Sequence, residues 1–280
     1  MKNPVTSWIG TAVLALALLP AASVFGQGRA PKPPQGPAPM LNGHPDLSGL
    51  WQRPYVPDMS VTTRNGDQIA DPSLPDVKAD PNAQAAGRKG PPGPPRKELP
   101  FSPEGERIWK SYDPAKGDYT GSCLPFGLIR SMNSPDPIQI MQSNTYVSLL
   151  YEQNTWFKVF PVDGRKHRDI VATWFGDSVG RWDGDTLVVD TINFNGKTRL
   201  DTIGHPHSDQ LHVVEHFTRK DAGHIGYEIT IDDPKYYTRP WKNTRTFTLR
   251  PDWEIMEYSC EENNKDFLEG HIKGGLNPDK

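Results

Sequence analysis

The chain has 280 residues and a formal net charge of −3, from 31 Lys and Arg against 34 Asp and Glu. A mildly acidic chain without a basic run lacks the electrostatic footprint of a nucleic-acid-binding protein. Beyond one apolar run near the N-terminus, no stretch approaches the roughly 20 apolar residues that span a bilayer. We therefore expect no nucleic-acid partner and no stable membrane insertion.

The N-terminus has the pattern of an export signal. Lys2 precedes an apolar run from Trp8 to Leu19, and small residues follow before Gly26. This arrangement is typical of a cleavable signal peptide, so we assign residues 1–26 to it, with cleavage near Gly26. Removal of Lys2 with this segment changes the net charge from −3 to −4. The expected location is periplasmic or secreted.

The two cysteines, Cys123 and Cys260, lie far apart, and neither belongs to a C-x-x-C motif. In an oxidising compartment, an even number of well-separated cysteines indicates a disulfide. We therefore expect Cys123 and Cys260 to be bonded. Two buried free thiols are the alternative.

The segment 27–100 holds 16 of the 29 prolines. Proline cannot donate a backbone hydrogen bond, so this composition predicts an irregular arm with extended stretches. The apolar patch at 47–53 is the exception, and we expect a short strand docked on the main body there. One short helix is expected from Ser102 to about Tyr112, because Ser102 suits the N-cap and Pro103 the first turn.

From residue 138 onward, short runs with β-type composition alternate with turn residues. The predicted strands are Ile138–Met141, Tyr146–Tyr151, Thr155–Phe160, Ile170–Phe175, Val179–Trp182, Thr186–Asn193, Leu211–Arg219, Ile225–Asp232, Arg245–Arg250 and Glu254–Cys260. Hairpin turns are predicted at Asp163-Gly164, Asp183-Gly184, Ala222-Gly223 and Pro251-Asp252.

Short strands joined by tight turns, with no helices between them, predict an all-β fold built as an antiparallel meander. Closure into a barrel removes exposed edges, so we expect a lipocalin-like (calycin-like) barrel, with a β-sandwich as the alternative. The pair Gly49 and Trp51 resembles the Gly-x-Trp that opens the first strand of such barrels. The barrel domain is assigned to 101–265 and a tail to 266–280.

Several longer motifs carry a family resemblance. They are the run 174–191, with Trp174, Gly176, Ser178, Gly180, Trp182 and a Gly-Asp-Thr-Leu-Val-Val stretch, the run 204–215 around Gly-His-Pro-His-Ser, and the run 257–263 around Cys260. Together they resemble a family of exported bacterial proteins of unknown function. The resemblance implies export and a shared fold, and it implies no particular activity.

The run Gly176-x-Ser178-x-Gly180 matches the spacing of a nucleophile elbow. That elbow requires a helix directly after the serine, whereas a predicted hairpin follows here. We therefore interpret these glycines as a turn or bulge between strands.

The segment 205–216 holds four of the eight histidines and is the best candidate site. Histidine with an ordinary pKa near 6.5 is a natural acid or base, and a neighbouring aspartate orients it. The predicted catalytic residues are His205, His207, Asp209 and His212, with Asp232 and Asp233 as further possible partners.

A metal site is the alternative interpretation of this segment, with no cofactor as the default. Imidazoles and a carboxylate suit divalent zinc, iron, manganese or copper, so His205, His207 and Glu215 are the candidate ligands. Strand periodicity places His212 and Glu215 on opposite faces, which argues against a site that uses both. The third interpretation is that these histidines only satisfy buried backbone groups.

A second set of residues is expected to bind a ligand. The loop around Tyr237, Arg239 and Trp241 is aromatic, interrupts the strand pattern and carries a cation that suits a carboxylate. Trp182 is added as a pocket-lining aromatic, although core packing explains most aromatic residues equally well.

These features predict an enzyme with a small-molecule pocket inside the barrel, which uses His/Asp acid–base chemistry on an apolar or aromatic compound, as a lyase, isomerase or hydrolase. The alternatives are a non-catalytic ligand-binding barrel, a metal-dependent enzyme, and an envelope interaction module tethered by the proline-rich arm. The sequence indicates no oligomeric state.

Overall fold

The computed structural model describes residues 31–64, 66–78, 94–113, 118–262 and 264–265. Residues 31–32 group with a separate N-terminal unit and have no regular structure, and everything below concerns the unit that begins at Pro33. The strands are β1 (Met40–Leu41), β2 (His44–Pro45), β3 (Gly49–Gln52), β4 (Thr63–Arg64), β5 (Asp67–Gln68), β6 (Ile138–Gln142), β7 (Tyr146–Tyr151), β8 (Phe157–Pro161), β9 (Asp177–Asp183), β10 (Thr186–Ile192), β11 (His212–Arg219), β12 (His224–Asp232) and β13 (Trp241–Leu249). The helices are α1 (Pro103–Ser111), α3 (Leu128–Asn133) and the 3-10 turns η1 (Tyr119–Ser122) and η2 (Gln153–Thr155).

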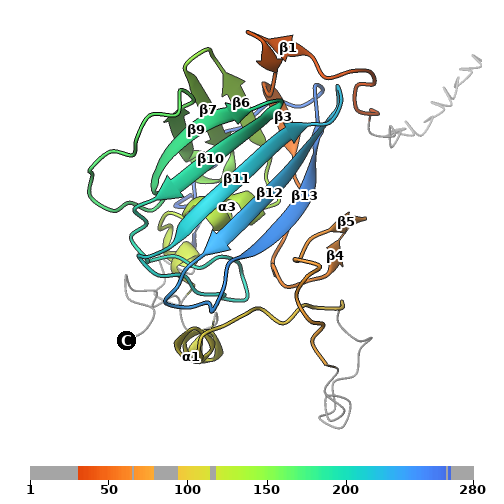
Figure 1. Ribbon diagram of the computed structural model, residues 1–280. Helices are drawn as coiled ribbons and strands as arrows, with labels where there is room; N and C mark the ends of the chain where they lie inside the picture. The colour runs from red at the N-terminus through yellow and green to blue at the C-terminus, as the bar shows by residue number, and fades with distance from the viewer. Residues whose placement is uncertain (1–30, 65, 79–93, 114–117, 263, 266–280) are drawn as a thin grey trace, which may run out of the picture. The chain divides into compact units, whose positions relative to one another are not determined.

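Nine of the strands form one antiparallel sheet in the order β8-β7-β6-β3-β13-β12-β11-β10-β9 (Figure 1). The two outer strands of this order, β8 and β9, contact each other, so the sheet curls into a nearly closed barrel. The predicted all-β barrel is therefore confirmed. β3 is hydrogen-bonded between β13 and β6, which makes it part of the barrel sheet rather than a strand docked on it.

Alternating residues of β11, β12 and β13 point into the barrel, as the alternating burial along each strand shows. Most inward positions carry large apolar side chains, and together they form the core. The register pairs Val213 with Ile231 and Phe217 with Tyr227, so the inward residues of neighbouring strands meet directly. This periodicity is the signal that made the strands predictable.

Gly180 of the G-x-S-x-G run lies where β9 approaches the segment that follows β8. A Cβ atom on Gly180 would come within 3.1 Å of Val162 and 3.2 Å of the Pro161 carbonyl oxygen. The Gly180 oxygen also accepts a hydrogen bond from Gly164 N at 3.0 Å. The glycine is needed for this close approach, and Ser178 is a buried strand residue that shares a hydrogen bond with Thr191. The run is not a nucleophile elbow, as expected, but the predicted turn or bulge was wrong, because Asp177–Asp183 pair with β10 in one uninterrupted register.

Helix α3, which the sequence did not predict, is buried along its whole length. Inward side chains bond to its C-terminal end: Arg53 donates to the Ser131 oxygen at 2.7 Å, and Arg245 donates to the Met132 oxygen at 3.0 Å. Cations there complement the negative end of the helix dipole. A gap between apolar inward side chains, including Leu149 and Phe217, is too small to hold a water molecule. This part of the described barrel interior is therefore packed core, and the expected cavity is not found there.

Two predicted strands were wrong. Residues 170–175 form an irregular segment in which Thr173 alone bridges to Phe194. β10 is hydrogen-bonded to one edge of β9, and β8 contacts β9 where the barrel nearly closes. Residues 254–260 form no strand, because β13 is already paired on both edges by β12 and β3. Pro251-Asp252 is therefore a turn without a hairpin, and Asp163-Gly164 opens the long connection to β9.

The hairpin between β9 and β10 turns one residue later than predicted. Asp183 pairs with Thr186, so the loop residues are Gly184 and Asp185. Gly184 has φ +56°, the left-handed conformation that this tight turn requires and that glycine adopts without strain. The predicted turn at Ala222-Gly223 does join β11 to β12.

The proline-rich segment packs on the barrel where it is described. Met59, Val61, Ile69, Leu74 and Leu99 are all buried. Isolated bridges pair Val61 with Arg96, Asp76 with Lys97 and Ala70 with Asn243, so part of the irregular backbone is hydrogen-bonded without long strands. The described part of the segment is irregular, as predicted, and it contributes buried side chains to the core.

Helix α1 begins as predicted, with the Ser102 hydroxyl accepting a hydrogen bond from Gly105 N at 3.1 Å. The expectation of a single helix was wrong because α3 has only six residues and no side-chain cap, which leaves little pattern in the sequence. In the part of the chain that the structure describes, no helix is both long and apolar enough to cross a membrane. The predicted signal peptide and the 266–280 tail lie outside the described residues.

Candidate functional site

Two loops at one end of the barrel carry several of the predicted site residues. Residues 193–211 join β10 to β11, and residues 233–240 join β12 to β13. Asp232 ends β12 and pairs with His212, which begins β11, so both loops leave the sheet at the same end. Asp233 links the two loops, because its carboxylate accepts hydrogen bonds from the backbone N–H and the hydroxyl of Ser208.

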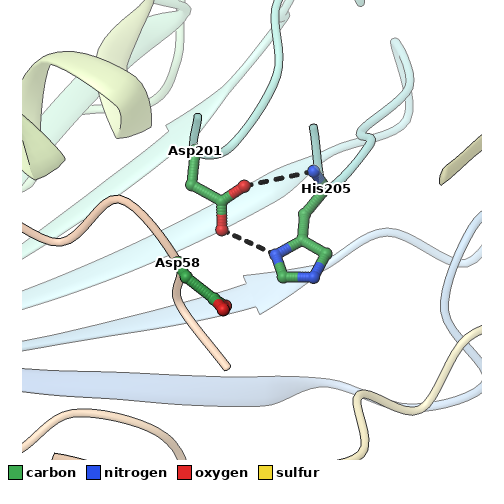
Figure 2. A group of neighbouring side chains, drawn as sticks. All are labelled: Asp58, Asp201 and His205. Carbon is green, nitrogen blue, oxygen red and sulfur yellow. Dashed lines mark hydrogen bonds and ion pairs between the residues drawn. The ribbon is translucent and has the colours of Figure 1, made fainter. Parts of the chain in front are cut away.

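His205 and Asp201 form a buried pair within the first loop. The Nδ1 atom of His205 lies 2.6 Å from Oδ2 of Asp201, and the backbone N–H of His205 donates to Oδ1 at 3.2 Å. Figure 2 shows both contacts and the second ring nitrogen pointing away from Asp201. Because the carboxylate accepts at Nδ1, we assign the proton to that nitrogen. Nε2 is then the basic atom, and it makes no hydrogen bond within the described residues.

Asp201 is held from the proline-rich segment and from α3. Met59 N donates to Oδ2 of Asp201 at 2.8 Å, and Arg130 donates to the backbone oxygen of Asp201 at 3.2 Å. The side chain of Asp201 is fully buried. A buried carboxylate with several donors keeps one orientation, so the imidazole of His205 is fixed as well.

Asp58 lies beside this pair and is also buried (Figure 2). Its Oδ1 accepts from the N–H of Ser60 at 2.9 Å and from the Ser60 hydroxyl at 2.6 Å. Its Oδ2 forms an ion pair with Arg96 Nε at 2.7 Å. The guanidinium of Arg96 therefore supplies positive charge beside two neighbouring carboxylates.

Asp58, Asp201 and His205 are also the described residues that best fit a metal. One potential ligand atom of each lies within 4.8 Å of the others. Two carboxylates and an imidazole suit a divalent transition metal. In the described arrangement, however, hydrogen bonds or the Arg96 ion pair already engage all four carboxylate oxygens. A metal would have to displace Arg96, whose side chain is 49 % exposed.

His205 lines a cleft of about 780 Å³ between the barrel end, α1 and the proline-rich segment. Phe101 and Trp109 form an aromatic wall, with ring centroids 5.8 and 5.1 Å from that of His205. The cations Arg239 and Lys78 also line the cleft, and within the described chain no ion pair engages either one. The cleft therefore combines a histidine, a flat apolar wall and two cations without an ion pair among the described residues, with Glu98 and Glu106 also in its lining.

His207 lies apart from this cleft and is integrated into the loop. Its Nε2 accepts from the Thr198 hydroxyl at 2.5 Å, and its Nδ1 donates to the Ser208 carbonyl oxygen at 3.0 Å. Both ring nitrogens are thus engaged in a fully buried setting, so we do not include His207 among the reactive or metal-binding residues. Burial lowers the pKa of His207 below its ordinary value of 6.5, so the ring is neutral.

We expect the His207→Gln variant to lose about 1–3 kcal/mol of unfolding free energy at neutral pH, because two buried hydrogen bonds are disturbed. The pKa of His207 is lower in the folded state than in the unfolded state. Its contribution to stability is therefore present above pH 6.5 and is lost as the pH falls from there toward the folded pKa.

Urea unfolding of both proteins at about pH 7.5 and about pH 5.5 measures this effect. The wild type should lose more stability on acidification than the variant does. An equal loss in both proteins would show that His207 titrates normally and that the ring is not held neutral.

The other predicted catalytic and metal residues lie elsewhere. Asp209 is exposed at the surface. His212 is on the outer face of β11, where its Nε2 lies 2.8 Å from Asp190. Glu215 points into the barrel and pairs with Lys158 at 2.6 Å. The prediction that His212 and Glu215 take opposite faces is confirmed, and of the three candidate metal ligands only His205 belongs to the cluster with Asp58 and Asp201.

The structure also places the predicted ligand-binding residues in different parts of the barrel. Arg239 lines the cleft directly. Tyr237 is buried beneath it, stacked on Phe101 at 5.2 Å, and Trp241 packs against Tyr237 at 5.4 Å. Trp182 stacks on His44 near the β9–β10 hairpin, at the opposite end of the barrel. Tyr237 and Trp241 therefore support the cleft wall, whereas Trp182 does not reach it.

Sequence reasoning missed Asp58, Arg96, Phe101, Trp109 and Asp201. Four of them precede the predicted barrel strands, in or next to a segment whose composition indicates an irregular arm. Asp201, only four residues before His205, was the one that spacing could have found. The expected disulfide between Cys123 and Cys260 is present, with a Cα–Cα distance of 5.5 Å.

Fold and site together define a nearly closed nine-stranded antiparallel barrel protein with a buried His–Asp pair in a cleft at the end of the barrel. No protein-family model matches the chain, and no curated protein matches it in sequence.

Proposed function

We propose that this protein is an exported acid–base enzyme that acts on a small molecule bound in the cleft at the barrel end. The observation that carries the proposal is the orientation of His205. Asp201 engages its Nδ1, which leaves Nε2 as a base in a side chain that lines the cleft. An imidazole oriented by a buried carboxylate is the usual arrangement for moving a proton near neutral pH.

The chemical role of each residue follows from this arrangement. His205 Nε2 takes a proton from the bound substrate, and Asp201 stabilises the imidazolium that forms. The same Nε2–H then returns the proton to another atom of the substrate, as in an isomerisation or elimination. The aromatic wall excludes water from one side of the cleft, which strengthens these interactions.

The lining favours an aromatic compound that carries a carboxylate. A planar ring can stack on Trp109 or Phe101, and Arg239 can bind a carboxylate in a bidentate manner. A non-catalytic binder would need the aromatic wall and the cation but not an oriented His–Asp pair. This pair is why we place the enzyme first and the binder second.

The expected result is proton exchange catalysed by the purified protein. A panel of aryl-substituted acetates, hydroxyacetates and 2-oxopropanoates is incubated in D₂O, and loss of the carbon-bound proton is followed by ¹H NMR. His205→Gln and Asp201→Asn should lower the rate roughly 10²–10⁴-fold. His224→Gln is the matched control, because His224 pairs with Asp221 near the β11–β12 turn at the other end of the barrel.

The geometry is tested without a substrate by ¹⁵N NMR of the imidazoles. We expect the Nδ1–H tautomer at His205 and a shift of its Nε2 resonance when a panel compound binds. Undiminished exchange in His205→Gln would refute the catalytic assignment, and binding without exchange would establish the binder instead.

The second candidate function is a metal-dependent reaction at Asp58, Asp201 and His205, favoured by the close approach of their ligand atoms. Export is proposed from the N-terminal pattern, and the disulfide supports it. One preparation from the periplasm, made without chelator, tests both proposals. A metal content near one atom per chain that is lost in His205→Gln would support the metal-dependent function. An intact mass that still includes residues 1–26 would refute cleavage of the signal peptide.

A further inference from the structure

A second cavity, of about 470 Å³, lies beside η1, α3 and η2. Three aromatic rings line it, those of Tyr55, Phe126 and Tyr258. A volume of this size accommodates a compact small molecule. Its walls include none of the residues that line the His205 cleft, so it is a separate space.

Most polar groups in this cavity are already matched. Arg130 forms an ion pair with Asp118 at 2.5 Å. Asn133 donates to the Leu200 oxygen and accepts from Arg245. Because the guanidinium of Arg130 and the amide of Asn133 already have partners, neither offers a free polar group to a ligand. A charged ligand would gain little here.

Gln153 is the exception. Its Oε1 atom is buried and has no hydrogen-bond partner within the described residues, although the side chain lines the cavity. A buried acceptor without a donor is destabilising by about as much as a lost hydrogen bond. Rotation of the amide would turn Oε1 toward the cavity, where a ligand with an O–H or N–H group would remove that penalty.

The third aromatic ring belongs to a strap, which we define as residues 250–262. The strap lacks helix and strand, and Ile255, Met256 and Tyr258 are all exposed. Its connections to the rest of the chain include the bond from Met256 N to the Glu152 carboxylate at 3.0 Å and the disulfide from Cys260 to Cys123. Because Tyr258 lies two residues before Cys260, the disulfide keeps that ring against the cavity.

We propose that this cavity is a second binding site, for an uncharged aromatic molecule that carries a hydrogen-bond donor, and that the disulfide completes it by holding Tyr258 in its wall. The ring of the ligand lies among Tyr55, Phe126 and Tyr258, and its O–H or N–H donates to Gln153. Reduction of the disulfide frees the strap and opens this wall.

The test uses 4-fluorophenol as the probe, observed by ¹⁹F NMR with the full-length mature protein, and fluorobenzene as the matched probe without a donor. We expect 4-fluorophenol to bind roughly tenfold more tightly than fluorobenzene, as one hydrogen bond to a buried acceptor predicts. Gln153→Leu should remove that difference, whereas Gln210→Leu, at an exposed position, should keep it.

The role of the strap is tested by two independent changes. Tyr258→Ala and reduction of the disulfide should each weaken 4-fluorophenol binding roughly tenfold, with circular dichroism showing that the barrel is intact. Tyr146→Ala is the control, because Tyr146 is similarly exposed but lies on β7 outside this cavity. Trp109→Leu, which removes part of the aromatic wall of the cleft, should leave the affinity unchanged and so separates this site from the cleft.

Equal affinity for the two probes, or binding that Gln153→Leu and Tyr258→Ala leave unchanged, would overturn the proposal. Binding lost in Trp109→Leu would also overturn it, because the probe would then occupy the cleft. If reduction unfolds the barrel, Tyr258→Ala decides the role of the strap, since it leaves the disulfide in place.

Discussion

Replacing Lys158 by methionine is expected to lower the free energy of unfolding by about 3–5 kcal/mol. Lys158 on β8 and Glu215 on β11 form an ion pair at 2.6 Å, with the two side chains 4 % and 0 % exposed. Removal of the ammonium group would leave a buried carboxylate without its counter-ion, and desolvation of that charge is the source of the loss.

The remaining partner of Glu215 cannot take over this role. The Tyr227 hydroxyl donates to Oε1 of Glu215 at 2.9 Å. Burial, together with the nearby carboxylate, raises the pKa of Tyr227 well above its ordinary value, so the phenol stays protonated and acts as a donor. A single neutral hydrogen bond contributes only about 1 kcal/mol, less than the charge requires.

Urea unfolding of Lys158→Met, Glu215→Leu and the double variant measures the coupling between the two side chains. The double variant should recover much of the stability, because neither charge is left unpaired. Lys242→Met is the control: Lys242 and Glu228 form a partly exposed pair at 3.1 Å, and its loss should cost less than about 1 kcal/mol. A Lys158→Met variant as stable as this control would show that the barrel interior is hydrated at this position.

Cys123→Ser is the second variant with a large expected effect, a loss of about 2–5 kcal/mol. Cys123 and Cys260 are separated by 137 residues, and the loss of so long a loop gives the unfolded chain more conformational freedom. The strap that carries Cys260 lies outside the sheet, so it also gains freedom in the folded state once the bond is absent. This gain should place the loss below the upper end of the range.

Thermal unfolding with and without a reducing agent measures this contribution. The wild type in reductant should match Cys123→Ser without it, because both lack the same bond. A wild-type melting temperature that reductant does not change would mean that the bond is absent in solution.

The barrel could be predicted because its strands follow a simple rule. Apolar residues alternate with polar ones along β11 and β12, and the predicted bounds lie within one residue of those observed. β13 was predicted four residues short at its start, because Asn243 and Arg245 occupy inward positions there. These polar side chains are buried because they bond to each other and to α3, and no alternation of apolar residues reveals that.

The candidate site could be predicted only in part. The density of histidines in 205–216 drew attention to the loop that holds His205, and the structure places Arg239, predicted separately as a ligand-binding residue, in the lining of the same cleft. Nothing local distinguishes His205 from His207, although one lines a cleft and the other bonds to Thr198 and Ser208. That difference depends on which neighbours each ring meets after folding.

Sequence by itself determined the antiparallel strands, which depend on periodicity along the chain, and the N-cap of α1, which depends on residue type. It also determined the disulfide, because the chain has only two cysteines. Tertiary structure alone decided where the cleft lies and what surrounds His205. Asp58 and Trp109 reach it from segments about 150 and 100 residues earlier in the chain, whereas the barrel interior, where the pocket was expected, holds tightly packed side chains and the buried helix α3. Such contacts are made by packing between distant segments, which leaves no periodic or local pattern in the sequence.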